Sequence, residues 1–193
     1  MGELNDYSGE YSPDARFEDF SKDALIRLLK SYQVAFVGYM GMCNTVNRER
    51  MSPEEAFELD AAVYEKWLGK FPLPLVTQAM GIEGNDVVTM LKYFQMAPDG
   101  AREGLYEFDY DVKSRNHAIL TFTKCPSLFY FERKGREEDI QSLCGPGGVE
   151  ERAFIEICRY FNPEMKVRAL KLPPRKSEND TCCQWEFKVE SGA

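Results

Sequence analysis

The sequence predicts one α+β domain in which N-terminal helices pack on a C-terminal antiparallel sheet of about four strands, with a crossover helix between strands. Up to about residue 98, apolar side chains recur at the three- and four-residue spacing of helices. Beyond residue 104 they alternate with polar ones, as in strands. Hydrophobic residues make up 44% of the 193 residues, which suffices for one core.

The chain is expected to divide into a polar N-terminal arm, residues 1–20, and a single domain, residues 21–190, with a helical part at 21–98 and a sheet part at 104–190. The arm has neither the basic start nor the apolar core of a secretion signal. No apolar run approaches the ~18 residues that span a membrane. We therefore expect a cytoplasmic protein without membrane contacts, and the net charge of -8 argues against a nucleic-acid partner.

The first predicted helix starts after Ser21, a good N-cap residue. Gly38 and Gly41 lie inside it, and because the apolar spacing continues through both we interpret them as a close-packing face. The apolar stripe consists of Leu25, Leu28, Leu29, Tyr32, Phe36, Tyr39, Met40, Cys43 and Val46.

The second predicted helix has a complete start signal. Ser52 is the N-cap, Pro53 occupies the first helical position, and Glu55 closes a capping box. Gly69 ends this helix. A short helix at about 75–80 and a fourth helix ending before Pro98 follow, separated by Gly81, with Asn85 or Asp86 as the cap of the fourth.

The sheet part begins with an aromatic-rich strand around Phe108. A turn at 113–116 joins it to a strand at 117–124, and two further strands are expected at 165–172 and 183–190. Residues 127–144 are ambiguous between a helix and an irregular crossing, and a crossover helix is expected at 149–161. The glycine-rich stretch 145–148 before that helix is most simply a loop, with anion binding as the minority alternative.

The chain has six cysteines and no common catalytic or phosphate-binding motif. We expect free thiols, because a cytoplasmic location is reducing. Cys125, Cys144 and Cys183 could converge at one end of the sheet, as a zinc or iron site through thiolates, or with Cys183 or Cys125 as a nucleophile. Alternatively, the cysteines are small apolar core residues.

His117 and Glu58 are the candidates for moving protons. His117 is the only histidine, so a Cys-His pair would have to use it. Glu58 shares a helix face with Glu65, although a solvated face is the simpler interpretation. A ligand pocket could be lined by aromatic side chains that otherwise form core: Phe36, Tyr39, Phe108, Tyr110 and Trp185.

Several short stretches together resemble one protein family over residues 21–190. They are Glu55-Ala56-Phe57-Glu58-Leu59-Asp60 with Tyr64-Glu65, Cys144-Gly145-Pro146, Phe161-Asn162-Pro163, Leu172-Pro173-Pro174 and Cys183-Gln184-Trp185-Glu186-Phe187. The family comprises uncharacterised bacterial and archaeal proteins related to the L-2-amino-thiazoline-4-carboxylic acid hydrolase-like proteins. The resemblance implies helices on an antiparallel sheet and, in the hydrolase-like members, opening of a cyclic C–N/C–S ring.

The chain departs from that family pattern in two places. Tyr39-Met40-Gly41 stands where relatives often have His-Asp-Gly, and Ala169 and Leu172 stand where they often have Cys-x-x-Cys. Two hypotheses follow for a small-molecule-binding domain. It is a hydrolase of a small C–N bonded, thiazoline-like substrate, or a non-catalytic domain that senses a ligand or metal through its cysteines and aromatic pocket.

Overall fold

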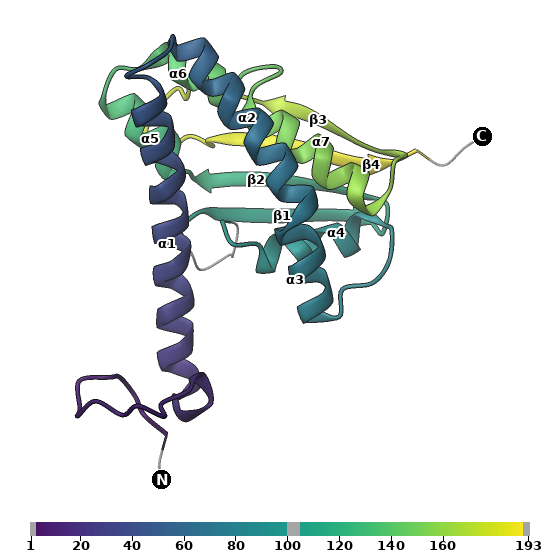
Figure 1. The fold of residues 1–193 in the computed structure, drawn as a ribbon. Coiled ribbons are helices and arrows are strands. Elements are labelled where there is room, and N and C mark those ends of the chain that lie inside the picture. The colour runs from purple at the N-terminus through teal and green to yellow at the C-terminus, as the bar shows by residue number, and fades with distance from the viewer. Residues whose placement is uncertain (1–2, 100–104, 191–193) are drawn as a thin grey trace.

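The computed structural model describes residues 3–99 and 105–190, and it confirms the α+β class (Figure 1). Helices come first along the chain, and the four strands lie in its second half. The elements are a 3-10 turn at Phe17–Asp19, then α1 (Lys22–Asn47), α2 (Pro53–Lys70), α3 (Pro72–Met80), α4 (Val87–Met96), β1 (Glu107–Ser114), β2 (His117–Lys124), α5 (Pro126–Arg133), α6 (Glu137–Cys144), α7 (Val149–Phe161), β3 (Met165–Lys171) and β4 (Cys183–Val189).

The four strands form one antiparallel sheet in the order β1-β2-β4-β3. The central pair is in register, with Ala118 opposite Phe187 and Leu120 opposite Trp185. All four of these side chains are buried beneath helices, whereas the alternate positions on the other face are exposed or half-buried. The alternation read from the sequence therefore assigns the covered face correctly.

Helix α7, the predicted crossover, lies across the covered face of the sheet (Figure 1). Phe154 packs edge-on against both Trp185 and Phe187, with ring centroids 5.0 and 5.6 Å apart. Helix α2 packs on α7 in turn. The core is thus built from two layers, and its centre is aromatic.

The predicted helix starts are present. Ser21 accepts a hydrogen bond from the amide of Ala24, Ser52 and Glu55 form the capping box, and Asp86 caps α4. Helix α3 starts at Pro72 rather than near residue 75, because proline is tolerated in a first turn whose amides have no helical partner. The ambiguous crossing 127–144 is helical in two pieces, α5 and α6.

Helix α1 differs from the expectation for its glycines. It projects from the body (Figure 1), and none of its residues is buried. Nothing lies within 4 Å of a side-chain carbon built at Gly38 or Gly41, so within one chain they form no close-packing face. Among the residues that the structure describes, no helix has the length and apolar character to cross a membrane.

Candidate functional site

A cavity of about 70 Å³ lies between α7, the sheet and the ends of α2 and α4. One water molecule needs ~10–15 Å³ of cavity volume, so this cavity could hold roughly five water-sized groups. Its walls are largely apolar and rich in aromatic rings, with a few polar groups. They are formed by Tyr64, Leu68, Tyr93, Phe94, Ala97, Asp99, Tyr106, Phe108, Phe122, Cys125, Cys144, Glu150, Ala153, Phe154, Ile157, Cys183 and Trp185.

Two carboxyl groups, Asp99 and Glu150, face this cavity. Counted by the exposed area of the whole residue, both are half-buried. Their carboxyl groups are nevertheless surrounded by protein, because the surface that they retain lies in the cavity. No described residue of the lining is a lysine, arginine or histidine. The cavity is therefore acidic within apolar walls, and neither carboxylate faces a positive partner there.

Asp99 follows α4 and accepts a short hydrogen bond from the hydroxyl of Tyr64 on α2. Burial raises the pKa of Asp99, and the hydrogen bond from Tyr64 opposes that shift. The same burial, together with the charge of Asp99, raises the pKa of Tyr64 well above its ordinary value. The phenol thus keeps its proton and acts as a donor.

Glu150 is in the first turn of α7. Burial, and secondarily the charge of Asp99, raises the pKa of Glu150 to about 7. Its place near the helix N-terminus acts in the opposite direction, since the helix dipole favours a carboxylate there. No hydrogen bond or ion pair joins the carboxyl group of Glu150 to another described residue, so its proton equilibrium is open to control by a ligand.

The three thiols that the sequence predicts to converge do line this one cavity. Cys125 caps α5, Cys144 ends α6 and Cys183 begins β4. Burial raises the pKa of all three, that of Cys183 to about 12. The indole N–H of Trp185 lies beside the Cys183 thiol, and its interaction with the sulfur partly opposes this rise in pKa. These thiols are protonated at neutral pH, which makes them poor nucleophiles.

The zinc or iron site suggested for Cys125, Cys144 and Cys183 is not formed. Across residues 3–99 and 105–190, no three or more histidine, cysteine, aspartate or glutamate side chains are grouped so that they could hold a metal ion. Lining one cavity places the thiols near each other but does not aim them at one point. All six cysteines are free thiols, as expected.

His117 and Glu58 lie away from the cavity, so the suggested thiol–base pairs are wrong. His117 Nε2 is 3.0 Å from Glu186 Oε1, on the face of the sheet that the helices leave open. Glu58 is on α2 and is paired with Arg152 across a different groove. Neither residue reaches Cys125 or Cys183 through the cavity.

The five aromatic residues predicted to line a ligand pocket do not lie together in the structure. Phe108 and Trp185 line the cavity. Tyr110 packs edge-on against Phe108 but outside the lining. Phe36 stacks on Trp67, and Tyr39 is 69% exposed on α1. Phe36 and Tyr39 thus lie on the projecting helix α1 rather than around the cavity. The apolar stripe of α1 contains more residues than the body of the protein covers.

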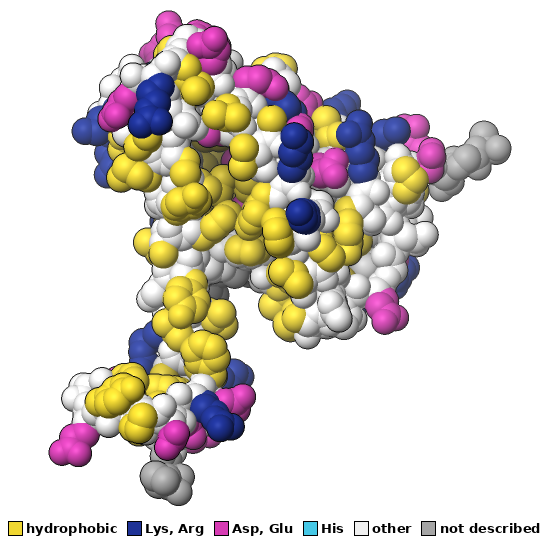
Figure 2. All heavy atoms as spheres, in the orientation of Figure 1, with side chains coloured by type: hydrophobic (Ala, Val, Ile, Leu, Met, Phe, Trp, Pro, Cys, Tyr) yellow, Lys and Arg dark blue, Asp and Glu magenta, His cyan; other side chains and the backbone are white. Residues whose placement is uncertain are grey.

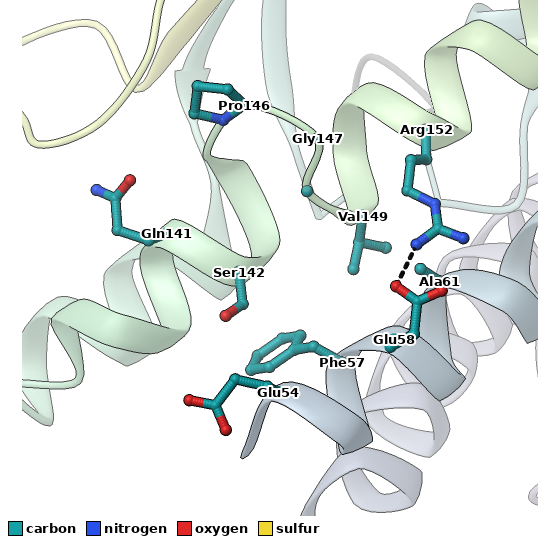
Figure 3. Close-up of a pocket in the computed structure, with 11 residues that line it drawn as sticks. Glu54, Phe57, Glu58, Ala61, Gln141, Ser142, Pro146, Gly147, Val149 and Arg152 are labelled. Carbon is teal, nitrogen blue, oxygen red and sulfur yellow. Dashed lines mark hydrogen bonds and ion pairs between the residues drawn. The ribbon is translucent and has the colours of Figure 1, made fainter. Parts of the chain in front are cut away.

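A second, open groove of about 190 Å³ lies where α2, α6 and α7 meet (Figure 3). Arg152 is clamped there by Glu58, with Nη1 2.6 Å from Oε2, and by Glu65, with Nε 2.7 Å from Oε1. The amide of Gly147 donates to Glu151 Oε2 at 2.6 Å. The glycine loop and the arginine are thus occupied by the chain's own carboxylates, which disfavours an external anion.

The sequence reasoning missed Asp99, Glu150 and Tyr64. A signal for Glu150 exists: it precedes Ala153, Phe154 and Ile157 by three, four and seven positions, so it lies on the buried stripe of its helix. An acidic residue on an apolar stripe is a functional candidate. Asp99 in its Pro-Asp-Gly turn gives no comparable signal.

No family model, curated protein or solved structure matches this chain. The resemblance to thiazoline hydrolase-like proteins therefore stays a hypothesis from short residue patterns.

Proposed function

We propose that this protein binds, in the α7–sheet cavity, a small molecule that is largely apolar and carries one positive charge. The observation that carries the proposal is the pair of buried carboxyls, Asp99 and Glu150, in an aromatic cavity without a described positive side chain. A buried carboxylate is costly unless it is paired. A cationic ligand would supply the missing partner.

The aromatic walls support the same class of ligand. Tyr64, Tyr93, Tyr106, Phe154 and Trp185 are among the aromatic residues that line the cavity. A cation over a ring face gains about 0.5–2 kcal/mol, and most in a desolvated site. A small organic ammonium or amidinium ion satisfies both the rings and the carboxylates, whereas the carboxylates would repel an anion of the same shape.

Hydrolysis of a small C–N bonded substrate is a second candidate, favoured by one observation. Glu150 has a pKa of about 7, the value best suited to a general base at neutral pH. It would take a proton from the water that adds to the ring carbon and return a proton to the leaving nitrogen. The raised pKa of the thiols argues against a cysteine nucleophile. A thiazoline-like ring of amidine type belongs to the cationic class proposed above.

A cytoplasmic location, and the absence of nucleic-acid and membrane partners, belong to the proposal as well. Six free thiols are typical of a reducing compartment. The net charge of -8 opposes binding to phosphate backbones and to anionic lipid surfaces.

The test compares three ligands of matched shape: isobutylamine, isobutanol and isovalerate. Calorimetry and thermal unfolding at pH 8 should rank the ammonium first and the carboxylate last. Glu150→Gln should remove most of that ranking, while Glu164→Gln at an exposed carboxyl should leave it unchanged. Equal binding of all three, or preference for isovalerate, would refute a cation site.

A further inference from the structure

Helix α1 has an apolar seam that no residue in the described part of the chain covers. Tyr32, Ala35, Tyr39, Met42 and Val46 are all exposed, with Tyr39 at 69% and Met42 at 61%. Figure 2 shows hydrophobic side chains gathered along the projecting helix. From Ser31 to Asn47 the helix has no charged residue. Such a stretch is unusual for a helix surface that faces water.

The contacts of α1 with its own body use a different edge. Phe36 stacks on Trp67, Gln33 Nε2 donates to the carbonyl of Ala97 at 3.4 Å, and Asn44 Nδ2 donates to Asp60 Oδ2 at 2.7 Å. At 100° per residue, this edge lies roughly a third of a turn around the helix from the exposed seam. The seam is therefore free to receive a second element while the body contacts remain intact.

The seam has the spacing of a coiled coil. Its positions alternate steps of three and four residues without interruption over three heptads, and each holds an apolar residue. They are Leu25, Leu28, Tyr32, Ala35, Tyr39, Met42 and Val46. One flank of the seam is occupied by the small residues Ser31, Gly38 and Thr45. Open space at Gly38 permits another helix to approach closely.

We propose that the seam binds the same seam of a second copy of this chain, as an antiparallel pair of α1 helices around a two-fold axis near Val37. In that register the seam positions from Leu28 to Val46 pair with one another, and each larger side chain meets a smaller or more flexible one. Ala35 lies opposite Tyr39 of the other copy, Tyr32 opposite Met42, and Leu28 opposite Val46. Alternation of large and small residues fills such a layer without voids.

A second copy fits better than the other occupants. The antiparallel pairing makes the patch self-complementary, as a two-fold interface requires. A parallel pair would instead place Ala35 against Ala35 and leave a gap between two tyrosine layers. Two chains that each carry a charge of -8 repel one another, and the uncharged seam is a place where they can meet with the least repulsion. Anionic lipid would be repelled by the same charge.

The oligomeric state tests this proposal. Sedimentation equilibrium of the full chain at tens of micromolar should give a dimer. Ala35→Glu should raise the dissociation constant by at least about a hundredfold, since a carboxylate would be forced against the partner's seam. Val34→Glu is the matched control: it is an adjacent, exposed position on the same helix but off the seam, and the dimer should persist. Circular dichroism checks that both variants fold.

Cross-linking tests the direction of the helices. In a Cys43→Ser background, oxidation of mixed Ala35→Cys and Tyr39→Cys chains should give a disulfide between unlike chains, and each variant alone should give little. A disulfide within Ala35→Cys alone would mean parallel helices and overturn the arrangement. A monomeric wild-type chain, a dimer indifferent to Ala35→Glu, or a monomer that binds anionic lipid vesicles through the seam would overturn the proposal.

Discussion

The ring of Phe36 on α1 stacks on Trp67 of α2, with centroids 4.6 Å apart and ring planes 22° apart. Trp67 stacks in turn on Tyr64 at 5.4 Å, and the hydroxyl of Tyr64 donates to Asp99 in the cavity. A continuous row of aromatic contacts therefore joins the projecting helix to the wall of the candidate site. The cavity and the exposed seam of α1 are distinct surfaces, but this row of aromatic contacts helps to position both.

Tyr64→Phe should lower the free energy of unfolding and change the protonation of Asp99. The phenol donates to a buried carboxyl, and a hydrogen bond to a charged group contributes about 1.5–3 kcal/mol. Without it the pKa of Asp99 should rise further, since the hydrogen bond lowers it. The loss of unfolding free energy should be greater at pH 8 than at pH 4, where the carboxyl is more protonated. Denaturant unfolding at both pH values measures this. Tyr130→Phe at an exposed ring should cost little, and an equal cost for both variants would contradict the assignment.

Glu150→Gln should stabilise the protein at alkaline pH and have little effect at pH 4. The pKa of Glu150 is raised to about 7, so the folded state holds this proton more tightly than the unfolded state. The free energy of unfolding should then fall as pH rises from about 4.5 to about 7, by about 3 kcal/mol for this group. Glutamine cannot ionise and avoids that loss. Thermal unfolding between pH 4 and 8 tests it, with Glu164→Gln as control. A parallel pH dependence in wild type and Glu150→Gln would contradict it.

A cationic ligand should bind more tightly as the pH rises, although the stability of the free protein falls over the same range. Because it pairs with the ionised carboxylate, its affinity should fall about tenfold per pH unit below 7 and level off above it. Isobutylamine titrated calorimetrically from pH 5.5 to pH 8.5 gives the profile. Isobutanol has no charge and should show a flat one. The pH dependence should also vanish in Glu150→Gln, and if it survives there, Asp99 rather than Glu150 pairs with the ligand.

The elements were predictable because they follow from local chemistry. Ser52 and Glu55 specify a helix start between themselves, and the alternation around Trp185 specifies which side of β4 is covered. The site was predictable only in part. The three thiols lie at element ends, where topology alone places them close together, whereas the bond between Tyr64 and Asp99 depends on how two helices pack. No local pattern encodes that packing.

His117 shows that residue type alone does not identify a site residue. Its residue type suited catalysis, but its position in β2 places it opposite Lys188 in the sheet register and beside Glu186. A one-residue shift along a strand changes the face of the sheet that a side chain occupies. Strand parity, which is readable from the sequence, places Ala118 and His117 on opposite faces, and the structure shows that the face of Ala118 is the covered one.

The cysteines should react slowly in the native protein. Burial raises the pKa of Cys125, Cys144, Cys158 and Cys183, so few thiolates exist at pH 7.5. Cys43 is half-exposed on α1 and should be alkylated first. Timed iodoacetamide labelling with peptide mass spectrometry resolves each site, and the unfolded chain provides the rate of an accessible thiol. Fast labelling of Cys125 or Cys183 would restore the thiol nucleophile that the structure disfavours.

Arg48→Met should loosen the C-terminal anchor of α1. Arg48 Nη1 is 2.7 Å from Asp139 Oδ1, and Asp139 is only 2% exposed, so its carboxyl group is bound by partners from the chain rather than by water. Arg136 also binds Asp139 and would remain, so the cost should stay below the 3–5 kcal/mol typical of an orphaned buried charge, at about 1–2 kcal/mol. Arg50→Met, at an exposed position two residues away, should cost almost nothing. Because α1 also contacts the body through Phe36, which stacks on Trp67, amine binding in Arg48→Met should fall by less than its stability does. If binding is lost entirely while the chain stays folded, the orientation of α1 controls the site.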